Sequence, residues 1–343
     1  MNKNLLLIGK RHKIGGENLS GGAIVLFEHL IKELNARKLN FDIIDTNYRN
    51  YSDSKLLAYF SIIFRIFKKV KGKDIIMLNG SNNVVLQYMP LLLFLRKNHN
   101  PQILLRLFGG NYDTYLHSLF SPLQMLAKWV IKRTDKVFYE PKHVLNKLQY
   151  LNPNSIWFPN VRNNSPIKTN PQFNRNFIYL GHIRKEKGID ELLEAFSILK
   201  TQGFSLSIYG NNVNYHAPHN LNNLFSEVYK GPIKSNQAYD IIRSCDVLIL
   251  PSYWKGEGYP GVIIEALSVG VPVIATKLSG IEEMVDETCG KLIPSQNSEA
   301  IIDAVKWIEK QDYKKLSEGA LEHFQLFNAE KVMDRIIDEI YSN

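Results

Sequence analysis

The sequence has little cysteine and no hydrophobic run long enough to cross a membrane. Only Cys245 and Cys289 occur among the 343 residues, too few for a disulfide scaffold or a cysteine-based metal cluster. The longest apolar stretch, residues 84–95, is shorter than a bilayer span and is interrupted by Gln87 and Pro90. No secretory signal opens the chain, because the first apolar run leads directly into a Gly-rich turn. These absences predict a cytoplasmic protein that is soluble or peripheral to a membrane.

What is present is an ordinary globular composition with an uneven charge. Hydrophobic residues make up 45% and charged residues 22%, which excludes a disordered, collagenous or coiled-coil chain, and the length favours two domains. Residues 1–170 carry 25 Lys and Arg against 10 Asp and Glu, whereas residues 171–343 carry the remaining 17 against 23. The net charge of +9 is therefore the sum of +15 and −6, and the two halves face different electrostatic partners.

Both halves alternate short β-branched or Leu-rich runs with longer amphipathic segments, the pattern of a parallel sheet with helical crossovers. In the first half the expected strands are 5–8, 41–45, 74–78, 103–108 and 137–139, and the expected helices 23–34, 55–70, 84–96 and 119–133. In the second half the expected strands are 177–180, 206–209, 227–229, 247–250, 273–275 and 291–293, and the expected helices 189–200, 236–243, 262–269, 299–309 and a tail that is helical over 313–341.

Residues 152–176 lose this periodicity and are rich in Asn and Pro, which is a linker composition. The sequence therefore predicts an α/β protein of two doubly wound, Rossmann-like domains that face each other across a cleft. The expected domains are residues 1–165 and 172–326. A C-terminal helix from about residue 327 to 343 can pack back onto the first domain.

The densest chemical signal is SYWKGEGYPGVIIEALSVGVPVIAT at residues 252–276. A buried strand ends at Pro251, a Gly-rich loop follows, and a helix begins near Val262. Free N–H groups at a helix N-terminus, with glycines that allow close approach, favour an anion such as phosphate. Glu257 lies in the loop and Glu265 about one turn inside the helix, so both can face one cleft. The alternative is a solvated loop acid and a helix-surface acid.

This segment resembles the E-x7-E signature of family 4 of the retaining glycosyltransferases, which have the GT-B fold. The resemblance implies that Glu257 contacts hydroxyls of the donor sugar and that Glu265 accepts hydrogen bonds from the nucleotide ribose. It also implies that the backbone of the loop lines the sugar and the diphosphate; the loop residues concerned are Gly258, Tyr259, Pro260 and Gly261. Carboxylates suit vicinal hydroxyls because each accepts two hydrogen bonds.

A second match is YLGHIRKEKGID at residues 179–190, a strand, a basic loop and the start of a helix. A diphosphate leaving group needs cations as the glycosidic bond breaks. Lys187 stands at the family's Lys position, but His182 stands where the family has an Arg. Arg184 could supply the missing guanidinium, or His182 could donate a weaker hydrogen bond. A solvated basic turn is the alternative.

Weaker matches complete the expected site. The resemblance places Gly21 and Gly22 in a loop near the donor phosphates or the acceptor, Gly210 beside the nucleotide, and Pro232 with Ile233 at the base. In the first half, Asn111 or Asp113 is expected to face the acceptor, or simply to cap the next helix. No metal and no cofactor are expected, since the resemblance implies metal-independent transfer.

Residues 55–73 (KLLAYFSIIFRIFKKVKGK) are aromatic, aliphatic and basic. This segment could lie on an anionic membrane, or its apolar side could cover the sheet with the cations solvated. Nucleic acid is not expected as a partner, because no aromatic-basic platform accompanies the charge.

The predicted function is retaining transfer of a sugar from a UDP- or GDP-sugar to a glycan or lipid-linked glycan. From the resemblance to the family, the expected product is a bacterial surface polysaccharide, either lipopolysaccharide O-antigen or capsule. We expect it to be formed in the cytoplasm at the inner face of the plasma membrane. Two alternatives stay open. One is another GT-B enzyme, such as a phosphorylase or a nucleotide-sugar hydrolase or epimerase, and the other is a non-catalytic polyanion-binding module.

Overall fold

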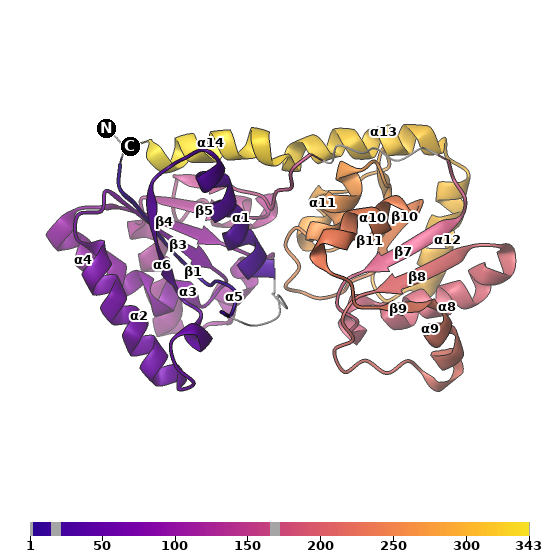
Figure 1. The fold of residues 1–343 in the computed structure, drawn as a ribbon, viewed down its shortest axis with the longest axis horizontal. Helices are drawn as coiled ribbons and strands as arrows, with labels where there is room; N and C mark the ends of the chain where they lie inside the picture. Colours follow the sequence, from indigo (N-terminus) through magenta and orange to yellow (C-terminus); the bar gives the residue numbers. More distant parts are fainter. Residues whose placement is uncertain (1–2, 15–21, 165–171, 343) are drawn as a thin grey trace. The chain divides into compact units, whose positions relative to one another are not determined.

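A computed structural model describes residues 3–14, 22–164 and 172–342 of the chain, which divides into two units (Figure 1). Unit 1 comprises residues 1–159 and 333–343, and unit 2 comprises residues 160–332. Each unit is built on one parallel sheet of 6 strands. Both sheets are covered by helices, as a parallel sheet buried on its two faces requires.

The sheet of unit 1 has the order β2-β1-β3-β4-β5-β6. Its strands are β1 (Leu5–Gly9), β2 (Phe41–Asp45), β3 (Ile75–Gly80), β4 (Gln102–Leu107), β5 (Lys136–Tyr139) and β6 (Ser155–Trp157). Its helices are α1 (Gly22–Ala36), α2 (Lys55–Val70), α3 (Val84–Gln87), α4 (Met89–His99), α5 (Tyr112–Ser118), α6 (Ser121–Arg133) and α7 (Lys142–Leu148). The central strands β1, β3 and β4 are almost wholly buried and mainly apolar, although they also bury Asn79 and Arg106.

The sheet of unit 2 has the order β12-β11-β10-β7-β8-β9. Its strands are β7 (Asn176–Leu180), β8 (Ser205–Tyr209), β9 (Tyr229–Gly231), β10 (Val247–Leu250), β11 (Val273–Thr276) and β12 (Gly290–Ile293). Its helices are α8 (Ile189–Leu199), α9 (Asn222–Val228), α10 (Ala238–Arg243), α11 (Gly261–Ser268), α12 (Ser298–Glu309) and α13 (Tyr313–Phe324). The strand order reverses within each sheet, between β1 and β3 in unit 1 and between β10 and β7 in unit 2, as in doubly wound folds.

The last helix, α14 (Ala329–Tyr341), begins in unit 2 and continues in unit 1. Within unit 1, Asp334 pairs with Arg37 of α1 at 2.8 Å. The Lys136 ammonium donates to the backbone oxygen of Glu339 at 2.7 Å. In the ranges that the structure describes, no helix is long and apolar enough to cross a bilayer.

Four sequence predictions were wrong in detail. The expected linker 152–176 contains strand β6, which pairs with β5. The single helix expected over 84–96 is two helices, because Pro90 lacks the N–H that would continue the first and stands in the opening turn of α4. The strand expected at 227–229 begins only at Tyr229, since α9 extends to Val228 and buries it. The tail expected to be helical over 313–341 is interrupted at Asn328, whose backbone is extended.

Two glycines in unit 2 offer a matched test of backbone packing. Gly188 and Gly203 both have a left-handed backbone, with φ of +74° and +84°. A Cβ on Gly188 would lie 2.2 Å from the backbone oxygen of Pro251, whereas a Cβ on Gly203 meets only a side-chain atom at 3.6 Å.

Gly203→Ala is expected to cost about 1 kcal/mol of unfolding free energy from left-handed strain alone. Gly188→Ala adds the collision with Pro251 and is expected to cost at least about 2 kcal/mol more. Urea unfolding of the two variants measures the difference. Equal losses would show that the approach of Gly188 to Pro251 carries no stability.

Candidate functional site

The candidate donor residues of unit 2 lie in loops at one edge of its sheet. The strands β10, β7, β8 and β9 are consecutive neighbours and parallel, so their carboxyl ends meet at the same edge. The loops that follow these strands carry His182, Arg184 and Lys187 after β7, Gly210 after β8, Pro232 and Ile233 after β9, and Glu257 to Gly261 after β10. Strand order alone therefore gathers residues that are up to 79 positions apart in the sequence (182 to 261).

Lys187 and Glu257 form an ion pair, although 70 positions separate them. The pair is largely buried, with 19% of the Lys187 side chain and 12% of the Glu257 side chain exposed. The same Glu257 oxygen accepts a hydrogen bond from the Ser252 hydroxyl at 3.1 Å. A cation and an acceptor-rich carboxylate thus stand side by side, which is what a diphosphate and a sugar hydroxyl require.

The two loops that carry this pair are joined through their backbones. Gly188 approaches the backbone oxygen of Pro251, and the Tyr253 N–H donates to the Glu186 oxygen at 2.9 Å. Gly188 also precedes helix α8 directly. Its left-handed turn therefore places Lys187 at the start of the helix and against the loop after β10.

His182 is exposed in the loop after β7, and its backbone oxygen accepts a hydrogen bond from the buried Tyr179 hydroxyl at 2.8 Å. Partial burial of the ring lowers the pKa of His182, and the positive charges of Arg184 and Lys187 lower it further. The imidazole is therefore neutral at neutral pH. Positive charge in this loop comes from Arg184 and Lys185, which are exposed, and from Lys187.

Glu265 lies in α11, where its carboxylate pairs with the Arg162 guanidinium at 2.7 Å. Only 10% of the Arg162 side chain and 17% of the Glu265 side chain are exposed. The guanidinium also donates to the side-chain oxygen of Asn160 at 2.7 Å. The nearby Tyr239 is half-buried, and this burial, followed by the charge of Glu265, raises its pKa. Glu265 is therefore held in one orientation by a buried cation.

The loop before α11 is shaped by close backbone contacts. A Cβ on Gly280 would lie 2.5 Å from the Gly258 oxygen, and a Cβ on Gly261 would lie 1.9 Å from Arg162. The Tyr259 side chain is buried, packs edge-on against Phe327, and donates its hydroxyl to Glu283. Tyr259 and Pro260 therefore leave mainly the loop backbone for a ligand.

The remaining candidates of unit 2 are backbone features. Gly210 has φ of +140°, and a Cβ there would lie 1.7 Å from the Gly181 oxygen, so only glycine fits between the loops after β7 and β8. Its own oxygen accepts from the Tyr229 hydroxyl at 2.9 Å. Pro232 is exposed and Ile233 is half-buried after β9.

The acceptor candidates belong to unit 1. Asn111 occupies the N-cap position of α5 without a side-chain capping bond, and its side-chain oxygen accepts from Asn82 at 3.2 Å. Asp113 is buried in the first turn of α5 and pairs with Lys147 at 2.7 Å. Burial raises the pKa of Asp113, but the hydrogen bond and charge of Lys147, the backbone hydrogen bond from Thr114 and the charge of His143 together lower it by more. Gly21 lies outside the described residues, and Gly22 is the exposed first residue of α1.

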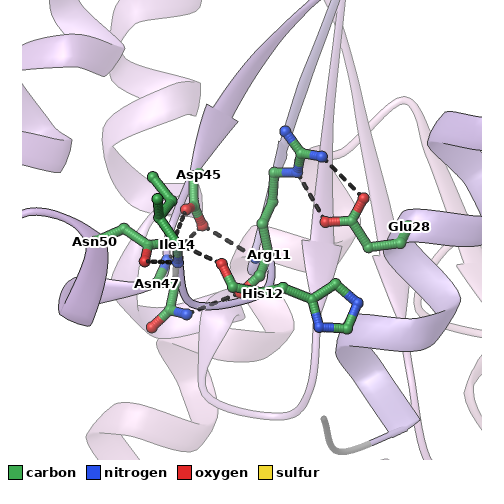
Figure 2. Close-up of polar contacts among 7 residues, drawn as sticks. All are labelled: Arg11, His12, Ile14, Glu28, Asp45, Asn47 and Asn50. Carbon is green, nitrogen blue, oxygen red and sulfur yellow. Dashed lines mark hydrogen bonds and ion pairs between the residues drawn. The ribbon is translucent and has the colours of Figure 1, made fainter. Parts of the chain in front are cut away.

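The loop after β1, which leads to the Gly-rich segment, is fixed by polar contacts (Figure 2). Arg11 makes two hydrogen bonds to Glu28 of α1, at 2.8 and 2.9 Å, and its N–H donates to Asp45 at 3.0 Å. Asn47 donates to the Arg11 oxygen and Asn50 to the His12 oxygen, each at 2.8 Å. Residues 10–14 are therefore held at the carboxyl edge of the first sheet.

Sequence reasoning missed Arg162, Asn160 and Ser252, which are now part of the candidate site. Arg162 and Asn160 fall in the segment read as a linker, and the partner of Arg162 is 103 positions away. No spacing rule connects such residues. Arg162 is one of two arginines in this Asn- and Pro-rich segment, and nothing in the sequence distinguishes it from Arg175.

Part of the sequence matches a known protein family. Residues 160–323 match the family Glycosyl transferases group 1. Over 141 residues, 39% of this chain, the sequence is 28% identical to the capsular polysaccharide biosynthesis glycosyltransferase CapM of Staphylococcus aureus, and this stretch spans 37% of CapM.

The fold is similar to that of sucrose-phosphate synthase of Thermosynechococcus elongatus, with a TM-score of 0.74, 18% identity and 99% of each chain covered. It is also similar to Anabaena HepE in complex with UDP-glucose, with a TM-score of 0.70, 14% identity, and 99% of this chain and 100% of that chain covered. The GT-B fold predicted from the sequence is confirmed.

The Arg162–Glu265 pair is expected to stabilise unit 2. Arg162→Met leaves the Glu265 carboxylate buried without its cation and is expected to lower the unfolding free energy by about 3 kcal/mol. The double variant Arg162→Met with Glu265→Gln removes both charges and is expected to recover part of that loss. Urea unfolding of both variants tests this; a double variant less stable than Arg162→Met would contradict it.

The cause of the low His182 pKa can be tested by NMR titration of the imidazole ring. Arg184→Gln removes a nearby positive charge, so protonation of the ring costs less and the pKa of His182 is expected to rise. Lys185→Gln is the matched control, because Lys185 is exposed and its charge is not among those that shift His182. An unchanged pKa in Arg184→Gln would contradict this electrostatic account.

Proposed function

We propose that this chain, which belongs to the glycosyl transferases group 1 family through residues 160–323, is a retaining transferase of nucleotide-activated sugars. The acceptor is a hydroxyl of a glycan or a lipid-linked glycan. The observation that carries the proposal is the buried meeting of Lys187 with Glu257 at the carboxyl edge of the second sheet. A cation for a departing diphosphate thus stands beside a carboxylate for the sugar that it leaves.

The proposed reaction exchanges one bond for another at the anomeric carbon. The acceptor oxygen forms a bond to this carbon as the bond to the diphosphate oxygen breaks, and the nucleoside diphosphate leaves with the electron pair. The acceptor proton passes to the departing phosphate oxygen on the same face of the sugar. Lys187 and Arg184 would balance the charge that develops on the diphosphate, and Glu257 would orient the sugar through its hydroxyls.

Glu265 and the loop before α11 would hold the nucleotide. The Arg162 guanidinium occupies one side of the Glu265 carboxylate and leaves its other lone pairs for ribose hydroxyls. The backbone of residues 258–261 would follow the sugar and the diphosphate. Gly210, Pro232 and Ile233 would border the nucleoside with backbone groups.

The proposed donor is a UDP-sugar and the proposed product a bacterial surface polysaccharide, capsule or O-antigen. The structure of HepE, which has the same fold, was solved in complex with UDP-glucose, and CapM is a capsular polysaccharide biosynthesis glycosyltransferase. We place the reaction in the cytoplasm at the inner face of the plasma membrane, where a lipid-linked glycan would present its hydroxyl. In unit 1, Asn111 is the better candidate for the acceptor, because Asp113 already pairs with Lys147.

Thermal unfolding with a series of nucleotide sugars tests this proposal. A true donor at about one hundred times its dissociation constant is expected to stabilise the protein by about 2.7 kcal/mol. Lys187→Gln and Glu257→Gln are each expected to lower the rate of transfer from that donor by about 100-fold or more. Lys185→Gln is the control for Lys187, since it removes an exposed charge two positions away.

Three outcomes would contradict the proposal in whole or in part. If no nucleotide sugar stabilises the protein, the donor site is absent. If the nucleotide is released at full rate without any acceptor, the chain is a nucleotide-sugar hydrolase. Full transfer activity in Glu257→Gln would remove this residue from the mechanism.

A further inference from the structure

Unit 1 exposes large apolar side chains on three of its helices. In α2 they are Leu56, Leu57, Tyr59, Phe60, Phe64 and Phe67; α4 adds Phe94, and α6 with the residue before it adds Phe120, Met125, Leu126 and Trp129. Helix α2 packs against α4, and α4 packs against α6, so the three helices are neighbours. They cover one face of the unit 1 sheet (Figure 1). We call the outward side of these helices the α2–α4–α6 surface.

Helix α2 has two apolar sides, and only one of them is used by the fold. Ala58, Ile62, Ile66 and Val70 recur every four residues and are buried. The aromatic stripe points outward, with Phe60 60% and Phe64 69% exposed. The hypothesis that the apolar side of this helix covers the sheet therefore explains the buried stripe. It does not explain the exposed aromatic stripe.

The charge of this surface has one sign. Helices α2, α4 and α6 contain no Asp or Glu. Lys68, Lys71 and Lys132 are exposed, as is Lys97 at the end of α4. Two cations of these helices are paired: Lys69 of α2 with Asp42, which also pairs with Lys73, and Arg96 of α4 with Asp135.

Aromatic and lysine residues on one surface favour a bilayer over a protein partner. Protein interfaces deplete lysine, and a protein that covered so many cations would have to supply many carboxylates. Aromatic rings and long basic side chains are instead the pair that membrane interfaces select, because the apolar part enters the lipid and the charge stays among headgroups. Both requirements are met along a single helix, α2, which exposes aromatic rings from Tyr59 to Phe67 and carries Lys68 and Lys69 in its last turn.

We propose that the α2–α4–α6 surface docks the protein on a bilayer that contains anionic lipid, with α2 lying in the plane of the headgroups. This inference rests on the proposed function, because docking would bring the protein to a lipid-linked acceptor that lies in such a bilayer. The phenylalanines of α2 supply apolar insertion, and the lysines at its end supply attraction to acidic headgroups. Binding is accordingly expected to weaken as salt is raised.

Sedimentation of the full chain with vesicles is the test. The protein is expected to bind vesicles of phosphatidylglycerol mixed with phosphatidylcholine, and to bind phosphatidylcholine vesicles much more weakly. Phe60→Ser combined with Phe64→Ser is expected to lower the affinity for the mixed vesicles by at least about tenfold. Lys68→Gln combined with Lys71→Gln is expected to lower it by about thirtyfold.

Matched controls lie on unit 2. Ile198→Ser replaces an apolar side chain that is 50% exposed, and Lys314→Gln with Lys315→Gln removes two exposed charges from α13. Neither control is expected to change vesicle binding. Stabilisation by UDP-glucose, measured on every variant, reports whether unit 2 is intact, and circular dichroism reports whether unit 1 remains folded.

The outcomes separate this inference from the proposed function. Failure of the wild-type chain to bind the mixed vesicles, while a nucleotide sugar still stabilises it, overturns the docking and leaves the transferase in place. Vesicle binding without donor stabilisation overturns the transferase alone. If the phenylalanine variants lose their fold, the lysine pair decides the question. The wild type could instead fail to bind vesicles and self-associate, with the lysine or phenylalanine variants abolishing this self-association. That outcome would assign this surface to a second copy of the chain.

Discussion

Arg162 is the residue on which the architecture of unit 2 depends. Its N–H donates to the Phe327 oxygen at 3.0 Å, and its oxygen accepts from the Ala329 N–H at 2.8 Å. The segment that leads into unit 2 is thereby tied to the segment that leads out of it. The same residue sends its guanidinium to Glu265, and Gly261 has no room for a side chain because that guanidinium lies against it. Residue 162 thus ties the two segments together through its backbone, and its buried guanidinium holds the helix with the candidate ribose carboxylate.

A second ion pair, between Lys187 and Glu257, joins the loops after β7 and β10, just as the Arg162–Glu265 pair holds α11. In each pair a candidate ligand group is oriented by an opposite charge that comes from a distant part of the chain. Buried carboxylates without such partners would be costly to keep charged. Gly188 allows the loops after β7 and β10 to approach closely enough for Lys187 to pair with Glu257. Candidate binding groups and fold stability therefore rest on the same contacts.

Sequence patterns predicted most elements and the core of the candidate site. The helix at 55–70 was predicted with the bounds that the structure shows, because a long amphipathic run between turn signals has no other good solution. Glu257, Lys187 and Glu265 were found because their neighbours form recognisable motifs. Helices α5 and α7 were missed, since each has only 7 residues and little periodicity to detect. Strand β6, with 3 residues, was hidden in a segment whose Asn and Pro content suggested a linker.

By itself, the sequence determined the α/β class, the division of charge between the two halves and the loops that carry the candidate site residues. These follow from local periodicity, composition and motifs, which need no knowledge of distant residues. Only the tertiary structure decided that Arg162 meets Glu265, that Lys187 meets Glu257, and that the phenylalanines of α2 point outward. An ion pair between residues 70 or 103 positions apart depends on strand order, which no local pattern encodes. The exposed side of a helix with two apolar stripes depends on which stripe packs on the sheet.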